Sequence, residues 1–149
     1  GTIPKGFLTA CWVALEDIDK NNGPLQIVEG SHKLKDVDYY DLKIKPARNT
    51  KLCEDIYRNY ENYVNELISI KGMDIKKISM KKGHCLIWSA NLLHGGSKIN
   101  SKKRTRYSQV THYNFEGCDH YYHPFFSVPP LGKYIVRDLQ KIDIRKYKV

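Results

Sequence analysis

Residues 82–97 read Lys-Gly-His-Cys-Leu-Ile-Trp-Ser-Ala-Asn-Leu-Leu-His-Gly-Gly-Ser. The run from Cys85 to Ala90 is apolar and follows a turn at Lys81-Lys82-Gly83, so it predicts a buried strand. His94 comes directly after this apolar segment, and two glycines follow it. A histidine where an apolar strand opens into glycines can direct its imidazole into the mouth of a barrel, because glycine permits close approach of backbone or ligand. His94 is therefore a candidate metal ligand, and a hydrogen-bonded turn histidine is the alternative interpretation.

Further strands and one helix are predicted on either side of this segment. Residues 7–15 are apolar at nearly every position, which is typical of a strand covered on both faces. Asn22-Gly23-Pro24 is the strongest turn signal in the chain. In residues 52–68 apolar side chains recur at helical spacing, and Gly72 is placed to end the helix. Other strands are predicted at 25–28, 73–80 and 104–115.

These elements favour one fold class. Many short strands with one inserted helix around 52–68 indicate a mainly β protein, a double-stranded β-helix of jelly-roll or cupin-like type, rather than an alternating α/β fold. A chain of 149 residues with 41% hydrophobic content can bury one core, so residues 1–149 are expected to form a single domain. We interpret residues 33–51 as a loop that leads into the helix. The tail is expected to be an aromatic covering segment, with Tyr121, Tyr122, Phe125, Phe126 and prolines at 129 and 130.

The composition gives no sign of a membrane or nucleic-acid partner. No apolar run approaches the length of a membrane span, and no secretory signal is visible. The four cysteines form no C-x-x-C pair, which fits reduced thiols in a cytoplasmic protein. The net charge of +9 comes with lysines that are spread along the whole chain. Because a basic balance indicates nucleic-acid recognition only together with a recognition motif, solvated lysines are the favoured interpretation.

Two arginines follow His94 at a short distance. Residues 100–108 read Asn-Ser-Lys-Lys-Arg-Thr-Arg-Tyr-Ser, which places Arg104 and Arg106 at the expected start of the next strand. Arginine presents a rigid, permanently charged fork that grips a carboxylate through two parallel hydrogen bonds. An arginine paired with an iron-binding histidine suits 2-oxoglutarate, which must be held at both ends.

Two blocks of the sequence resemble the phytanoyl-CoA dioxygenase family of iron(II)- and 2-oxoglutarate-dependent oxygenases. The first block is similar to the family's W-x-A-L-x-D … N-G-x-L … P-G-S-H-K pattern and runs from Trp12 through Asn22-Gly23-Pro24-Leu25 to Lys33. The second is similar to G-D-x-x-x-(F/W) … H-G-S … N-x5-R and runs from Gly83 to Arg106. Two departures, His84 for the usual Asp and Glu29 for the usual Pro, both fall in turns.

The resemblance implies roles for individual residues. His94 would be the distal iron ligand, and Arg106 would bind the far carboxylate of 2-oxoglutarate. Trp12 would line the co-substrate pocket, and Ser97 would add a hydroxyl near the same carboxylate. Arg104 is the less favoured alternative to Arg106, because the family spacing counted from Asn100 falls on Arg106 and then places the family's next histidine on His112. Counting from His94 is one residue too long, which implies an insertion near residues 98–99.

The family's other two iron ligands form an H-x-D or H-x-E pair, and this sequence contains no such triplet. The pair would lie a little upstream of the strand with Trp12. We therefore expect the chain to be a fragment whose fold is incomplete at its N-terminus. We also expect its Fe(II) site to be incomplete and the fragment to be inactive by itself. His32 fits a histidine that stabilises a turn better than a metal ligand. His120-x-x-His123 is disfavoured as a substitute pair because it lies among aromatic residues.

The resemblance implies a dioxygenase that hydroxylates a small-molecule substrate, with Fe(II) as cofactor and 2-oxoglutarate as co-substrate. One alternative is a non-catalytic jelly-roll module, or pseudoenzyme, that keeps the arginine pocket for a carboxylate ligand. The other is a basic nucleic-acid-binding domain, which the missing recognition motif disfavours. The sequence indicates no membrane partner and no particular oligomeric state.

Overall fold

The computed structural model describes residues 1–37, 42, 50–122 and 136–143. One α-helix, α1, spans Thr50–Ile70, and a short 3-10 helix, η1, spans Ser31–Lys33. The strands are β1 (Thr2–Ile3), β2 (Leu8–Ala14), β3 (Leu25–Val28), β4 (Ile75–Ile78), β5 (Cys85–Ser89), β6 (His94–Gly96), β7 (Ser108–Asn114), β8 (His120–Tyr122) and β9 (Val136–Arg137). The mainly β fold with one inserted helix is therefore confirmed.

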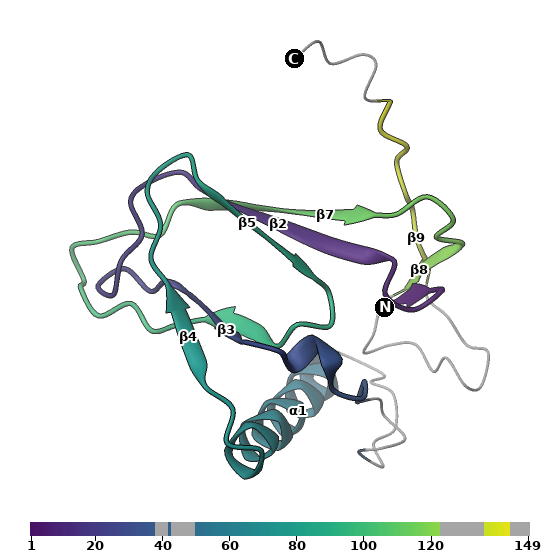
Figure 1. Ribbon diagram of the computed structural model, residues 1–149, viewed down its shortest axis with the longest axis horizontal. Coiled ribbons are helices and arrows are strands. Elements are labelled where there is room, and N and C mark those ends of the chain that lie inside the picture. The colour runs from purple at the N-terminus through teal and green to yellow at the C-terminus, as the bar shows by residue number, and fades with distance from the viewer. Residues whose placement is uncertain (38–41, 43–49, 123–135, 144–149) are drawn as a thin grey trace.

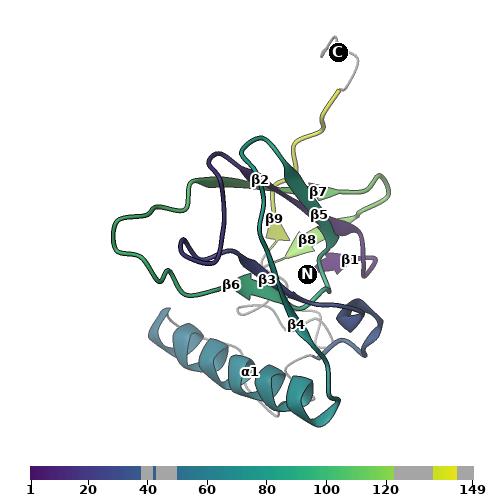
Figure 2. The same cartoon turned by 60° about the vertical axis from the view of Figure 1, so that its left-hand side comes forward.

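The chain alternates between two antiparallel three-stranded sheets (Figures 1 and 2). One sheet has the order β5-β2-β7 and the other the order β4-β3-β6. The chain passes from β2 to the second sheet for β3 and β4, returns for β5, crosses again for β6 and returns for β7. This repeated crossing is the connectivity of a double-stranded β-helix, which agrees with the predicted fold class. A third, smaller sheet has the order β1-β8-β9.

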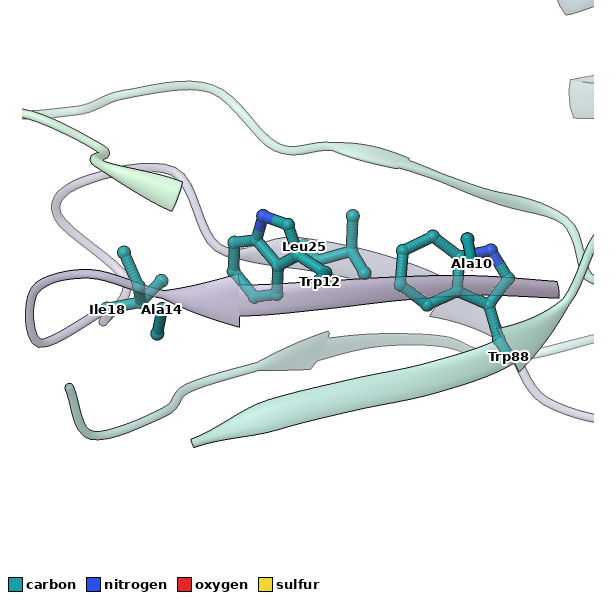
Figure 3. Close-up of a cluster of buried hydrophobic side chains, with 6 residues drawn as sticks. All are labelled: Ala10, Trp12, Ala14, Ile18, Leu25 and Trp88. Atoms are coloured by element: carbon teal, nitrogen blue, oxygen red, sulfur yellow. The ribbon is translucent and has the colours of Figure 1, made fainter. Parts of the chain in front are cut away.

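The core lies between the two larger sheets, and β2 supplies half of its buried side chains (Figure 3). Along β2, buried and half-buried residues alternate, so that Leu8, Ala10, Trp12 and Ala14 face inward. This alternation follows from the two-residue period of a strand. Trp88 of β5 and Leu25 of β3 join the same cluster from either sheet. Side chains from both sheets thus hold the two layers together by burying apolar surface.

A strand covered on both faces was predicted at 7–15 and a buried strand at 85–90, and both predictions overestimate the burial of β2 and β5. Trp88 is the one buried residue of β5, whereas Ile87 on the opposite face is 64% exposed. The apolar residues of β2 also leave the outward face only half-buried. A continuous apolar run fits a doubly covered strand, but here only the inward face of the sheet is covered.

The helix predicted at 52–68 is confirmed as α1, and the figures place it on the side of β3 and β4 that faces away from β2, β5 and β7 (Figures 1 and 2). Ile56 and Ile68 are its buried residues. The helix ends in a Schellman motif, in which Met73 N donates to Ile68 O and Gly72 N donates to Ser69 O. Gly72 has a φ of 59°, the left-handed conformation that this motif requires, as the sequence indicated.

The last long strand is shorter than predicted. The alternation from 104 to 115 predicts a strand over the whole segment, whereas β7 begins at Ser108. The preceding residues bond to Glu16 instead, because its carboxylate accepts from Thr105 Oγ1 and from Tyr107 N. Arg104 and Arg106 therefore lie in the connection between β6 and β7, and strand alternation does not determine where their side chains point.

Part of the predicted organisation lies outside the described residues. This applies to most of the predicted loop at 33–51 and to the tail with Phe125, Phe126 and prolines 129 and 130. Of the tail, Tyr121 and Tyr122 are described and belong to β8. Among the described residues, no helix is both long and apolar enough to cross a membrane.

Candidate functional site

His94 is the first residue of β6, and its side chain lies on the face of the sheet that looks toward the core. His94 pairs with Ile27 and Gly96 pairs with Leu25, two β3 residues that belong to the core cluster or pack against it. Paired residues point to the same face of a sheet. Across the space between the sheets, the ring centroids of His94 and Trp88 are 4.9 Å apart. His94 therefore sits at the margin of the core, with its residue surface exposed.

One nitrogen of His94 is held by the backbone. Nδ1 lies 2.7 Å from Leu92 O, a hydrogen-bond distance that requires the proton on Nδ1. In a neutral imidazole of this tautomer, Nε2 keeps its lone pair. A backbone carbonyl on Nδ1 is also the partner that typically orients a metal-binding histidine. The ring is thus prepared to accept a metal through Nε2.

Arg106 lies in a cradle made by backbone atoms. Its Nη1 donates to Gly23 O at 2.7 Å and contacts Ser97 O at 3.4 Å. A Cβ atom built on Gly96 would lie 2.8 Å from Nη1 and 3.2 Å from Nη2, so the guanidinium rests directly on this glycine. Gly23, whose φ is +73°, would bring a Cβ within 2.7 Å of Ser97 O. Both positions need glycine because the guanidinium and the β6 backbone approach them closely.

The cradle places the guanidinium on the same face of β6 as the His94 imidazole. Positions 94 and 96 are two residues apart in one strand, so their side-chain directions agree, and such positions lie roughly 7 Å apart. Arg106 Nη2 has no hydrogen-bond acceptor in the part of the chain that the structure describes. The Arg106 guanidinium, which has an unused donor, and the His94 imidazole, which can bind a metal, therefore lie on the same face of the sheet.

Arg104, the alternative carboxylate ligand, already bonds to other residues of the protein. Its Nη1 lies 3.2 Å from Asp19 Oδ2 and its Nη2 donates to Asp17 O at 3.1 Å. The Asn21 backbone N–H, followed by the positive charge of Arg104, keeps the pKa of Asp19 below its usual value. Arg104 thereby fastens the loop between β2 and β3 and has its charge compensated.

The side chains of Trp12 and Ser97 are both held by contacts within the protein. Trp12 is 3% exposed and forms part of the core between the sheets. The Ser97 hydroxyl donates to Pro24 O at 2.7 Å, and its backbone N–H donates to the same oxygen. The Ser97 hydroxyl proton is therefore used to join β6 to the turn at Gly23-Pro24.

The remaining histidines do not complete a metal site within the described residues. His32 lies in η1, where its carbonyl accepts from Asn91 Nδ2, and His112 lies in β7 opposite Ala10. His120 begins β8, and His123 lies outside the described residues. In the described ranges, no three His, Cys, Asp or Glu side chains gather closely enough to hold a metal ion. His94 alone does not fit a three-ligand iron centre.

Two features of the site were not identified from the sequence. Trp88 was recognised only as an apolar residue of a motif, although its ring contacts His94. Gly23 was interpreted as a turn residue, and Gly96 as one of two glycines that permit close approach of backbone or ligand, but Arg106 was not identified as the side chain that approaches them. A glycine that accommodates a side chain from another loop leaves no signal in its local sequence.

Comparisons with known proteins identify one matching family model and similar solved structures. The model of the family described as "Phytanoyl-CoA dioxygenase (PhyH)" matches residues 2–107. Among solved structures, the non-heme alpha ketoglutarate dependent epimerase SnoN from nogalamycin biosynthesis is 22% identical and covers 73% of this chain and 35% of its own, with a TM-score of 0.48. EctD from S. alaskensis, solved with bound Fe, is 20% identical over 76% of this chain and 33% of its own, with a TM-score of 0.46. The chain thus spans about a third of either protein. No curated protein matches.

Proposed function

This chain belongs to the phytanoyl-CoA dioxygenase family, and from that membership we propose that it forms the co-substrate-binding part of an iron(II)- and 2-oxoglutarate-dependent oxygenase. The observation that carries the proposal is the position of Arg106. Its guanidinium rests on Gly96, on the face of β6 to which His94 also belongs. The separation between these positions is comparable to the length of a five-carbon dicarboxylate.

The residues fit 2-oxoglutarate at its far end. Arg106 uses one amino group on Gly23 O, which fixes the guanidinium, and Nη2 remains available to a carboxylate. A charge-assisted hydrogen bond from a pre-oriented arginine is stronger than one between neutral groups. Since the cradle holds the guanidinium before any ligand arrives, little side-chain freedom remains to be lost on binding.

The residues fit iron only in part. His94 can offer Nε2, but a non-haem iron centre of this kind needs a second histidine and a carboxylate. We propose that these two ligands come from residues outside the 149 of this chain, which would make the chain inactive by itself. Iron and 2-oxoglutarate would supply the oxidation, while the protein positions the groups and excludes water. The roles left to this chain are to hold the far carboxylate through Arg106 and to orient one ligand through the Leu92 carbonyl.

The main alternative is a non-catalytic module that binds a carboxylate. The lack of a three-ligand metal cluster in the described ranges favours it. In both cases a small molecule is the proposed partner, and the same arginine binds it. Only the metal chemistry separates the two functions.

Succinate formation tests the enzymatic proposal. A longer protein that includes an H-x-D pair, supplied with iron(II) and 2-oxoglutarate, is expected to form succinate, whereas the 149-residue chain is expected to form none. Arg106→Ala in the longer protein should greatly reduce succinate formation because the co-substrate is no longer held. Turnover that does not respond to this substitution would contradict the role of Arg106, and iron-loaded protein without any turnover would favour the binding module.

A further inference from the structure

Trp88 carries a buried donor that has no partner. The residue is 6% exposed, and Nε1 is the one buried side-chain nitrogen or oxygen without a hydrogen bond in the described part of the chain. An indole N–H can only donate. Most buried polar groups in folded proteins are paired, because an unpaired one loses its hydrogen bonds to water without replacement. The exception therefore calls for a partner that the described residues do not supply.

The position of Trp88 indicates what this partner is. Trp88 stands on the inward face of β5, beside Ala10 and on the same side of the sheet as Trp12 (Figure 3). Its ring lies 4.9 Å from the His94 ring, with 58° between the ring planes. The unpaired donor thus belongs to the side chain that packs on the candidate metal ligand. A ligand that reaches from Arg106 toward His94 would bring its second carboxylate to this side chain.

We propose that Trp88 Nε1–H donates a hydrogen bond to the metal-side carboxylate of bound 2-oxoglutarate. This inference rests on the proposed function and deepens it, because it assigns a protein ligand to the second carboxylate. Trp88 then binds one end of the co-substrate and Arg106 the other. The pattern that this chain resembles accepts Phe or Trp at position 88, so the ring satisfies the fold and the N–H is an additional ligand.

Trp88→Phe separates the N–H from the ring. In the ligand-free chain, this variant should keep or raise the unfolding temperature, since it removes an unpaired buried donor and keeps an aromatic ring in the core. It should weaken 2-oxoglutarate binding about fivefold, which corresponds to about 1 kcal/mol. A large loss of thermal stability with unchanged affinity would identify the indole as a structural donor and overturn the inference.

The indole N–H signals provide a direct measurement. The chain has two tryptophans, so a ¹⁵N-labelled sample gives two indole signals, which Trp88→Phe and Trp12→Phe assign. Titration with 2-oxoglutarate should shift the Trp88 N–H proton downfield, in step with binding. Butyrate, which keeps one carboxylate for Arg106 and lacks the other, should leave the Trp88 signal in place.

The outcomes distinguish this inference from the proposed function. Saturable, Arg106-dependent binding of 2-oxoglutarate with an unmoved Trp88 signal would overturn the role of Trp88 and leave the proposed function intact. Absence of saturable binding in the wild-type chain and in Trp88→Phe alike would overturn both. Equal shifts with butyrate and 2-oxoglutarate would place the Trp88 donor at the wrong end of the ligand.

Discussion

Arg106→Ala is expected to weaken the binding of 2-oxoglutarate by about a hundredfold. Hydrogen bonds to charged groups contribute about 1.5–3 kcal/mol, and a hundredfold change in affinity corresponds to about 2.7 kcal/mol. The loss should be large because the guanidinium is already fixed by the hydrogen bond from Nη1 to Gly23 O, which leaves Nη2 available to the ligand. Isothermal titration calorimetry of the wild-type chain and the variant measures the difference.

Two controls separate a specific contact from the loss of one positive charge. Lys103→Ala removes the same charge from an exposed neighbour and should leave the affinity within about twofold of wild type, because exposed charges are screened. Arg104→Ala should lower the unfolding temperature, since Arg104 fastens Asp19 and Asp17, but should change affinity little. If Arg104→Ala abolished binding and Arg106→Ala did not, Arg104 would be the carboxylate ligand.

Gly96→Ala is expected to reduce 2-oxoglutarate affinity ten- to a hundredfold while the fold survives. The added methyl group would lie 2.8 Å from Nη1 and 3.3 Å from Cζ of Arg106. These atoms form the far end of a flexible side chain, so the guanidinium can move away at small cost to the folded state. Once moved, it no longer presents Nη2 at the oriented position. Calorimetric titration and thermal unfolding, performed on the same sample, measure the two effects separately.

Gly95→Ala is the matched control for this experiment. It adds the same methyl group one residue away in β6, where the nearest atom to a Cβ is Gln26 Nε2 at 4.0 Å. Adjacent residues in a strand point to opposite faces, so this methyl group lies away from Arg106. The affinity of Gly95→Ala should remain close to that of wild type. Equal losses of affinity in both variants would mean that β6 tolerates no side chain, and that the cradle at Gly96 is not specific.

The parts of the fold with a strong local pattern could be predicted from the sequence. The turn at Asn22-Gly23-Pro24 precedes β3, which spans Leu25–Val28 as predicted. The helical spacing of apolar residues, together with Gly72, identified α1 and its end. These elements follow rules that act over a few residues, and neighbouring parts of the chain do not overrule them.

The parts that depend on distant contacts could not be predicted in the same way. The burial of Ile87 was overestimated because an apolar run does not reveal that only one face of its sheet is covered. Ser108 rather than Arg104 begins β7, because residues 105 and 107 bond to Glu16, about ninety positions earlier. Likewise, the ion pair of Arg104 with Asp19 separates two arginines that the sequence presents as near equivalents.

We propose that the His94 imidazole and the Arg106 guanidinium lie at opposite ends of one bound 2-oxoglutarate molecule. Intermolecular nuclear Overhauser effects between ¹³C,¹⁵N-labelled chain and unlabelled 2-oxoglutarate measure this directly. We expect the methylene protons nearest the far carboxylate to contact the Arg106 side chain, and the methylene protons nearest the keto group to contact the His94 and Trp88 rings. Contacts to Arg106 without any to His94 or Trp88, or no contacts to either end, would contradict this arrangement of the ligand.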